Sequence, residues 1–170
     1  MGKLRNFTFW SPKKNGLWEH QQIAICTAVA YIHGEKEIPG RQGVTEAALL
    51  KLPTASADGH LYFDQSLFHA DFSADVPKAD ARFMAISQVM PAVAVASTPV
   101  TQAAWKNKPS WAVISTVDRT INPDLQRYMT KRAGIKTVEI DGSHVAFIAR
   151  PADVAKVIEQ AAAAAAASHD

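Results

Sequence analysis

The chain has only one cysteine, little net charge and no long hydrophobic run, and each of these features excludes a structural or functional possibility. A lone cysteine, Cys26, excludes an internal disulfide, and its apolar surroundings are typical of a small buried side chain. A net charge of +2 over 170 residues provides no basic footprint for nucleic acid or for a membrane surface. The apolar run 23–32 is about half as long as a transmembrane helix, and no small-residue cleavage site follows it. We therefore expect a cytoplasmic protein without a signal peptide.

With 48% hydrophobic and 20% charged residues, the chain has the composition of a globular protein, and its length suits one domain. Residues 1–22 form an atypical N-terminal segment that carries aromatic residues without a sustained period. We place one α/β domain over residues 23–160, with a lid-like insertion at about 43–104. Its first element is the run 23–32, which we predict to be a strand buried on both faces. The Ala-rich tail, 161–170, is predicted to extend the last helix.

Prolines interrupt the lid-like insertion, so its predicted helices are short. The first begins after Asp64, a suitable N-cap residue, and carries Leu67, Phe68 and Phe72 on one face. The second begins near Pro77, ends at Pro91 and places four apolar residues at helical spacing: Ala79, Phe83, Ile86 and Met90.

The C-terminal third alternates regularly between strands and helices. "SWAVIST" (110–116) and "KTVEI" (136–140) are predicted strands. Between them, Asn122 caps a helix that starts with Pro123 and stops at Gly134. A last helix opens at Pro151 with Val154, Val157, Ile158 and Ala161 on one face. This order predicts an α/β fold in which the two strands are parallel neighbours joined by a right-handed crossover.

Two polar residues follow these strands where each one ends. Asp118 lies on the exit loop of the first strand, and His144 lies on the exit loop of the second, in "EIDGSHVAFIARP". Exit loops of neighbouring parallel strands face one crevice, and the strands themselves lie about 4.8 Å apart. An Asp bonded to one imidazole nitrogen leaves the other nitrogen free to accept a proton. Each residue alone is often just a turn residue, but their arrangement favours an acid and a base.

The remaining histidines predict no further chemistry. Four residues of the lid-like insertion could be drawn together as metal ligands on paper: His60, Asp64, His69 and Asp71. Their spacing is not that of a metal site, so we expect no bound metal, and no motif indicates another cofactor.

The two exit loops resemble the C-terminal part of the α/β-hydrolase family, most closely its small bacterial esterase-like branch with a helical lid. The similar stretches are "KPSWAVISTVDRTINPDLQRYMTKRAG" and "VEIDGSHVAFIARPADVAKVIEQA". A D-x-x-x-x-P loop supplies the acid in that family, which matches Asp118 and Pro123. A G-S-H loop after the final strand supplies the base, which matches His144. The resemblance covers roughly residues 23–160 and implies a partial α/β-hydrolase fold with about three parallel strands.

The chain departs from this family at the nucleophile. The family carries it on a G-x-S-x-G elbow that precedes the acid and the base, and no such pattern occurs here. Ser143 precedes the base on its own loop, Ser115 lies inside a strand, and Cys26 has no elbow glycine beside it. No H-G-G-G-like stretch is present for the usual oxyanion hole.

The resemblance therefore implies an esterase-like protein that has the acid and the base of a Ser-His-Asp triad without the serine. We expect it to be inactive alone towards a small ester or acyl substrate. Two alternatives stay open: a non-catalytic interaction module derived from a hydrolase, or a fragment completed by the serine of a partner chain. An unpaired sheet edge also predicts a homo-oligomer or a poorly soluble monomer.

Overall fold

The described part of the chain is centred on two parallel strands, β5 (Trp111–Ser115) and β6 (Lys136–Ile140). The computed structural model describes residues 6–12, 18–24, 54–94, 106 and 108–167. In the register of the parallel pair, Val113 lies opposite Val138 and Ser115 lies opposite Ile140. Both strands therefore end at the same edge of the sheet, as the strand–helix–strand order predicts.

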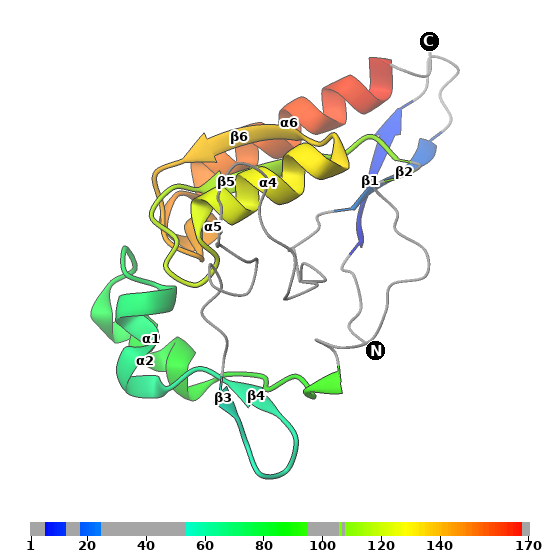
Figure 1. Ribbon diagram of the computed structural model, residues 1–170. Helices are drawn as coiled ribbons and strands as arrows, with labels where there is room; N and C mark the ends of the chain where they lie inside the picture. Colours follow the sequence, from blue (N-terminus) through cyan, green and yellow to red (C-terminus); the bar gives the residue numbers. More distant parts are fainter. Residues whose placement is uncertain (1–5, 13–17, 25–53, 95–105, 107, 168–170) are drawn as a thin grey trace.

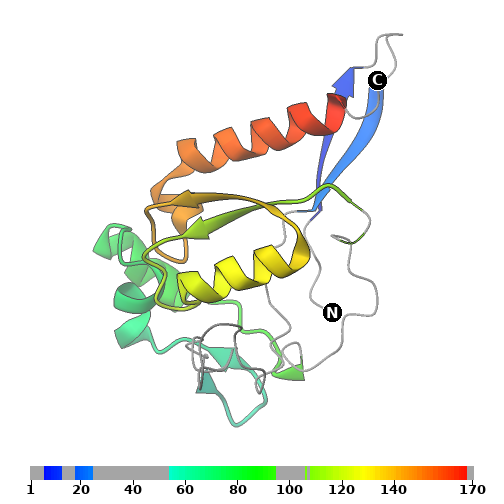
Figure 2. The same cartoon turned by 45° about the horizontal axis from the view of Figure 1, so that its top comes forward.

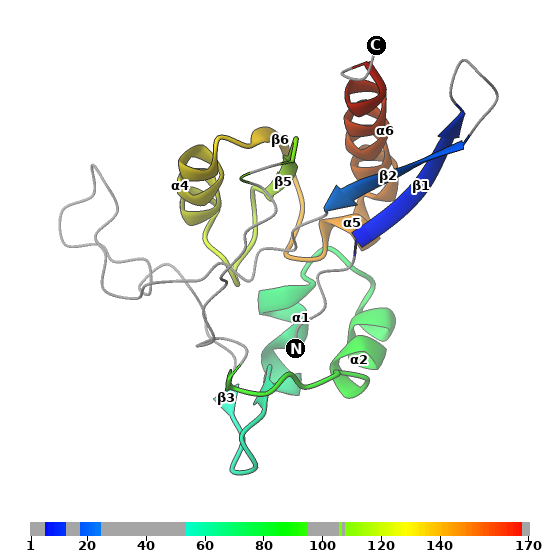
Figure 3. The same ribbon diagram turned by 90° about the vertical axis from the view of Figure 1, so that its right-hand side faces the viewer.

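Helices cover both faces of this pair. α4 (Pro123–Ala133) connects β5 to β6, and α6 (Pro151–Ala167) follows β6. Figure 3 shows α4 and α6 on opposite sides of the two strands, which gives three layers. Their buried apolar side chains form the core of this unit: Ile114, Leu125, Met129, Ile140, Val157 and Ala161.

The ends of α4 follow directly from its sequence. The side chain of Asn122 accepts a hydrogen bond from the backbone N–H of Asp124 at 2.9 Å, and Pro123 takes the first helical position. Gly134 ends the helix in the left-handed conformation, with φ of 65°. The predicted cap, first turn and stop of this helix are all confirmed.

A second group of elements lies beside the carboxyl ends of β5 and β6 (Figure 1). It contains the helices α1 (Gln65–Phe72) and α2 (Lys78–Ile86), preceded by the short antiparallel strands β3 (Thr54–Ala55) and β4 (Leu61–Tyr62). The predicted cap of α1 is present, because Asp64 accepts from the backbone N–H of Ser66. These elements belong to the predicted lid-like insertion.

The prediction for α2 was wrong in its extent. The helix ends at Ile86, short of Pro91. Gln88 explains this end, because its amide donates to the carbonyl of Ala85 and also exchanges two hydrogen bonds with the backbone of Phe63. Ala81 and Ala85 form the buried face, while Phe83 and Ile86 are 72% and 63% exposed.

The N-terminal strands are antiparallel. β1 (Asn6–Pro12) pairs with β2 (Trp18–Ala24), and Figure 2 shows this hairpin near the C-terminal end of α6. The predicted strand at 23–32, which was to be the third parallel strand, lies outside the described residues except for Ile23 and Ala24, which end β2.

Among the described residues, no helix is long and apolar enough to span a membrane. Among the described strands, β6 pairs only with β5. The predicted homo-oligomer stays a prediction.

Candidate acid–base site at the strand ends

Asp118 is held at the end of β5 by the turn that it begins. One carboxylate oxygen, Oδ1, accepts hydrogen bonds from the backbone N–H groups of Thr120 at 2.7 Å and Ile121 at 3.0 Å. The side chain is 3% exposed. Short polar side chains commonly bond to the backbone a few residues ahead in this way, so the loop folds around its own carboxylate.

The other carboxylate oxygen of Asp118 meets His144. Its Oδ2 lies 2.9 Å from Nδ1 of the imidazole ring. Because a carboxylate only accepts, the Nδ1 atom carries the hydrogen in this bond, and Nε2 of the neutral ring is left as a proton acceptor. The His144 side chain is 20% exposed. The structure thus brings together the two residues that the strand order placed at one edge.

The exit loop of β6 is anchored to the exit loop of β5. Beyond the strands, the backbone N–H of Thr116 donates to the carbonyl of Ile140 at 2.9 Å, and that of Val117 donates to Gly142 at 3.3 Å. The short helix α5 (Ala146–Ala149) follows, although this stretch was predicted to be loop throughout. The hydrogen bonds between the two chain segments therefore continue past the strands to Gly142, two residues before His144.

The last turn of α1 and the turn that follows it contact both exit loops. The hydroxyl of Thr120, two residues after Asp118, donates to the carbonyl of Asp71 at 3.1 Å. Phe72 packs its ring against the imidazole of His144, with ring centroids 4.6 Å apart. Asp75 accepts a hydrogen bond from the backbone N–H of Ser143 at 2.8 Å. Thr120, His144 and Ser143 therefore all have a partner in α1 or in the turn after it.

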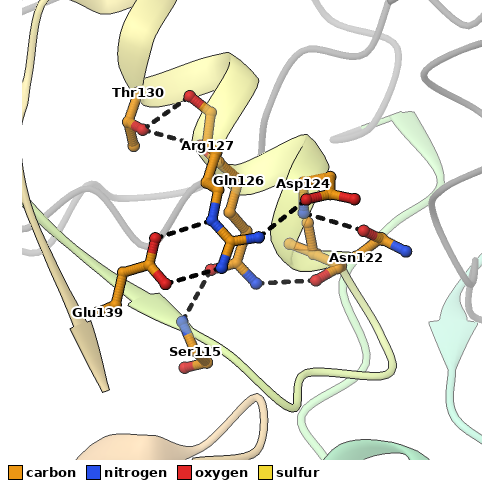
Figure 4. A network of polar contacts seen from close by, with 8 residues as sticks. Ser115, Asn122, Asp124, Gln126, Arg127, Thr130 and Glu139 are labelled. Atoms are coloured by element: carbon orange, nitrogen blue, oxygen red, sulfur yellow. Dashed lines mark hydrogen bonds and ion pairs between the residues drawn. The ribbon is translucent and has the colours of Figure 1, made fainter. Parts of the chain in front are cut away.

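A network of charged side chains holds α4 to β6 on the outside of the site (Figure 4). The guanidinium of Arg127 forms two bonds of 2.7 Å with the carboxylate of Glu139 and one of 2.8 Å with Asp124. These bonds lower the pKa of Glu139 and raise that of Arg127. All three residues lie at the surface, so the network orients α4 more than it stabilises the fold.

Asp75 is an ionisable residue that contacts the exit loop of β6, called here the base loop because it carries His144. Desolvation raises its pKa, but the hydrogen bonds from Ser143 and the charge of Arg150 lower it by more, so the pKa lies below its ordinary value of 3.8. A lowered carboxyl pKa means that the ionised form stabilises the fold above about pH 4. This contribution is lost as the pH falls through the folded-state pKa.

We expect the backbone amide resonance of Ser143 to shift as the pH falls below about 4, because its acceptor becomes protonated. Asp75→Asn should abolish this pH dependence in a 15N–1H titration and cost less than about 1 kcal/mol, since the carboxylate is exposed. The control is Asp80→Asn, at an exposed residue of α2. An amide shift that persists unchanged in Asp75→Asn contradicts the contact.

The two serines discussed as nucleophiles are buried. Ser115 is 7% exposed and Ser143 is 1% exposed, with the Ser143 oxygen accepting from the backbone N–H of Val145 at 3.4 Å. Cys26 lies outside the described residues. The described part of the chain holds no group of three His, Cys, Asp or Glu side chains that could bind a metal ion.

The side chains once considered as metal ligands have local partners instead. His60 approaches Asp58 of its own hairpin at 3.3 Å, and His69 contacts the carbonyl of Val76 through Nε2 at 3.0 Å. Sequence reasoning missed three residues that contact the acid–base pair or its loops, Phe72, Asp75 and Gln126. No motif marks them. Phe72 and Asp75 reach the site from a distant segment, and Gln126 reaches Asp118, eight positions earlier, through the fold of the loop between β5 and α4.

A three-layer α/β unit with an acid and a histidine on neighbouring strand exits is an arrangement typical of hydrolases. Residues 20–157 match the alpha/beta hydrolase family, which is more than half of the chain. The chain therefore belongs to the alpha/beta hydrolase family. No curated protein matches it. The predicted family and the partial α/β-hydrolase fold are confirmed.

Proposed function

We propose that this chain carries the acid, Asp118, and the base, His144, of an esterase-type site, and that it is inactive alone because it lacks the nucleophile. The observation that carries the proposal is the 2.9 Å contact between Asp118 Oδ2 and His144 Nδ1. In a complete site, a serine attacks the acyl carbon of a small ester while Nε2 of the imidazole takes its proton and later returns it. Asp118 keeps the ring in the required tautomer.

The absence of the elbow motif supports the second half of the proposal. The motif places a serine on a strained turn between a strand and a helix, with backbone N–H groups nearby for the oxyanion. No serine or cysteine of the chain has that context. Removal of a triad nucleophile leaves only a small fraction of the catalytic rate, so an acid and a base without a serine do not make an efficient esterase.

One observation favours a second candidate, in which a serine of a partner chain completes the site. Val117, which precedes Asp118 in the chain, and Phe147, in α5 after His144, are 52% and 58% exposed. Large apolar side chains at a catalytic edge suit coverage by another protein surface. The same exposure fits a non-catalytic interaction module derived from a hydrolase.

The purified chain should hydrolyse p-nitrophenyl acetate at nearly the same rate as its His144→Ala variant. Any difference should not exceed the weak catalysis of a single imidazole group. A fluorophosphonate probe should not label the chain. The control is His60→Ala, which removes an imidazole of the β3–β4 hairpin that is 43% exposed, against 20% for His144, and lies outside the acid–base pair. Rapid turnover that disappears in His144→Ala but not in His60→Ala contradicts the proposed inactivity. Labelling that requires an added serine-bearing chain supports completion by a partner.

A further inference from the structure

Gln126 forms three hydrogen bonds that join the strand, the loop and the acid. Its amide nitrogen donates to Oδ2 of Asp118 at 2.8 Å and to the carbonyl of Ile121 at 2.8 Å. Its amide oxygen accepts from the backbone N–H of Ser115 at 3.1 Å. Figure 4 shows the side chain reaching from the first turns of α4 towards the end of β5.

The contact with Ser115 fixes which way this amide points. The N–H of Thr116 donates to Ile140 on β6, and successive residues of a strand point to opposite sides, so the N–H of Ser115 points away from β6. The oxygen of Gln126 takes that hydrogen. A flipped amide would turn its N–H groups towards the N–H of Ser115 and its oxygen towards the carboxylate of Asp118, and both contacts are repulsive.

The orientation of the amide determines the orientation of the carboxylate. Oδ1 of Asp118 accepts from two backbone N–H groups, and Oδ2 accepts from the amide of Gln126 and from His144. Four donors at separate positions define the plane of a carboxylate, and charge-assisted bonds of this kind are strong. Of these four donors, Gln126 is the side chain other than His144 itself, and its bond to Oδ2 does not depend on the position of the imidazole ring.

We propose that Gln126 is a positioning residue that holds the Asp118 carboxylate towards Nδ1 and thereby selects the tautomer of His144 with a free Nε2. The proposal rests on the proposed function, since the free Nε2 is what a general base requires. A purely structural role for Gln126, as a link between α4 and β5, makes a different prediction. It predicts lower stability without any change in the tautomer of the ring.

The test is 15N NMR of the histidine rings in the full chain, which reports the tautomer without any activity. In the wild type, we expect the neutral ring of His144 to carry its hydrogen on Nδ1. In Gln126→Leu, the ratio of the Nδ1–H to the Nε2–H tautomer should fall about tenfold, because the carboxylate loses a charge-assisted donor and its fixed orientation.

Gln126→Glu separates the two roles. A glutamate oxygen can still accept from the N–H of Ser115, so the link to β5 is retained, but the donor to Asp118 is replaced by a like charge. We expect the tautomer ratio to fall in this variant also, whereas a role limited to the link with β5 predicts an unchanged ratio. This variant remains informative if Gln126→Leu does not fold.

The control is Gln160→Leu, at an exposed glutamine of α6, which should leave the spectrum of His144 unchanged. An unchanged tautomer in Gln126→Glu overturns the positioning role. A wild-type ring that already carries its hydrogen on Nε2 overturns the proposed base itself. Esterase activity of the wild type contradicts the proposed inactivity and leaves the positioning result intact, so the two failures are distinguishable.

Discussion

Asp118→Ala should lower the free energy of unfolding by about 3–5 kcal/mol, because it removes the acceptor of several buried hydrogen-bond donors. The carboxylate is 3% exposed and accepts four hydrogen bonds. Alanine leaves the backbone N–H groups of Thr120 and Ile121 without their acceptor in a buried turn. Each unsatisfied buried donor costs about 1–3 kcal/mol. Urea denaturation followed by tryptophan fluorescence measures the loss.

Asp118→Asn is the matched variant, because it keeps the shape and removes the charge. Its oxygen can still accept from the two backbone N–H groups of the turn, so the loss should be about half as large, roughly 1–3 kcal/mol. Its amide nitrogen then faces Nδ1 of His144, which must become an acceptor, so the hydrogen of the ring moves to Nε2. Equal losses in the two variants would show that the turn does not depend on the carboxylate oxygens.

The sequence predicts the C-terminal unit well because its signals are local. The cap at Asn122, Pro123 and the stop at Gly134 determine α4 through backbone geometry that each residue type favours by itself. A helix between two strands then predicts parallel pairing, which places Asp118 and His144 at one edge. The approach of these two side chains follows from a short chain of local rules.

The sequence does not predict the contacts that surround the pair, because they join distant segments. Asp75 and Ser143 are separated by 68 positions, and no spacing rule relates them. A long-range contact also sets the end of α2. Gln88 bonds to Ala85 of its own helix, but it also bonds to the backbone of Phe63, 25 positions earlier. Tertiary contacts override helical periodicity there, which exposes Phe83.

Gly142→Ala should destabilise the protein by roughly 1–3 kcal/mol and disturb the acid–base pair, because the base loop has no room for a methyl group. A Cβ atom at Gly142 would lie 2.8 Å from Cβ and 3.3 Å from Cα of Ala146. Ala146 cannot move away easily, since it is 3% exposed and its N–H donates to the carbonyl of Ser143 at 3.1 Å. The loop must shift instead, and it carries His144.

A double-mutant cycle with Ala146→Gly isolates this clash. If the methyl groups collide, the double variant should be destabilised by less than the sum of the single variants. The Nδ1–H signal of His144, which we expect Gly142→Ala to weaken, should then be partly restored. Gly134→Ala is the control, because its cost comes from a backbone with φ of 65° and nothing lies within 4 Å. Ala146→Gly should not relieve it. Strict additivity of Gly142→Ala and Ala146→Gly would mean that α5 does not confine the base loop, and that the contacts of Ser143 and Asp118 hold His144 without it.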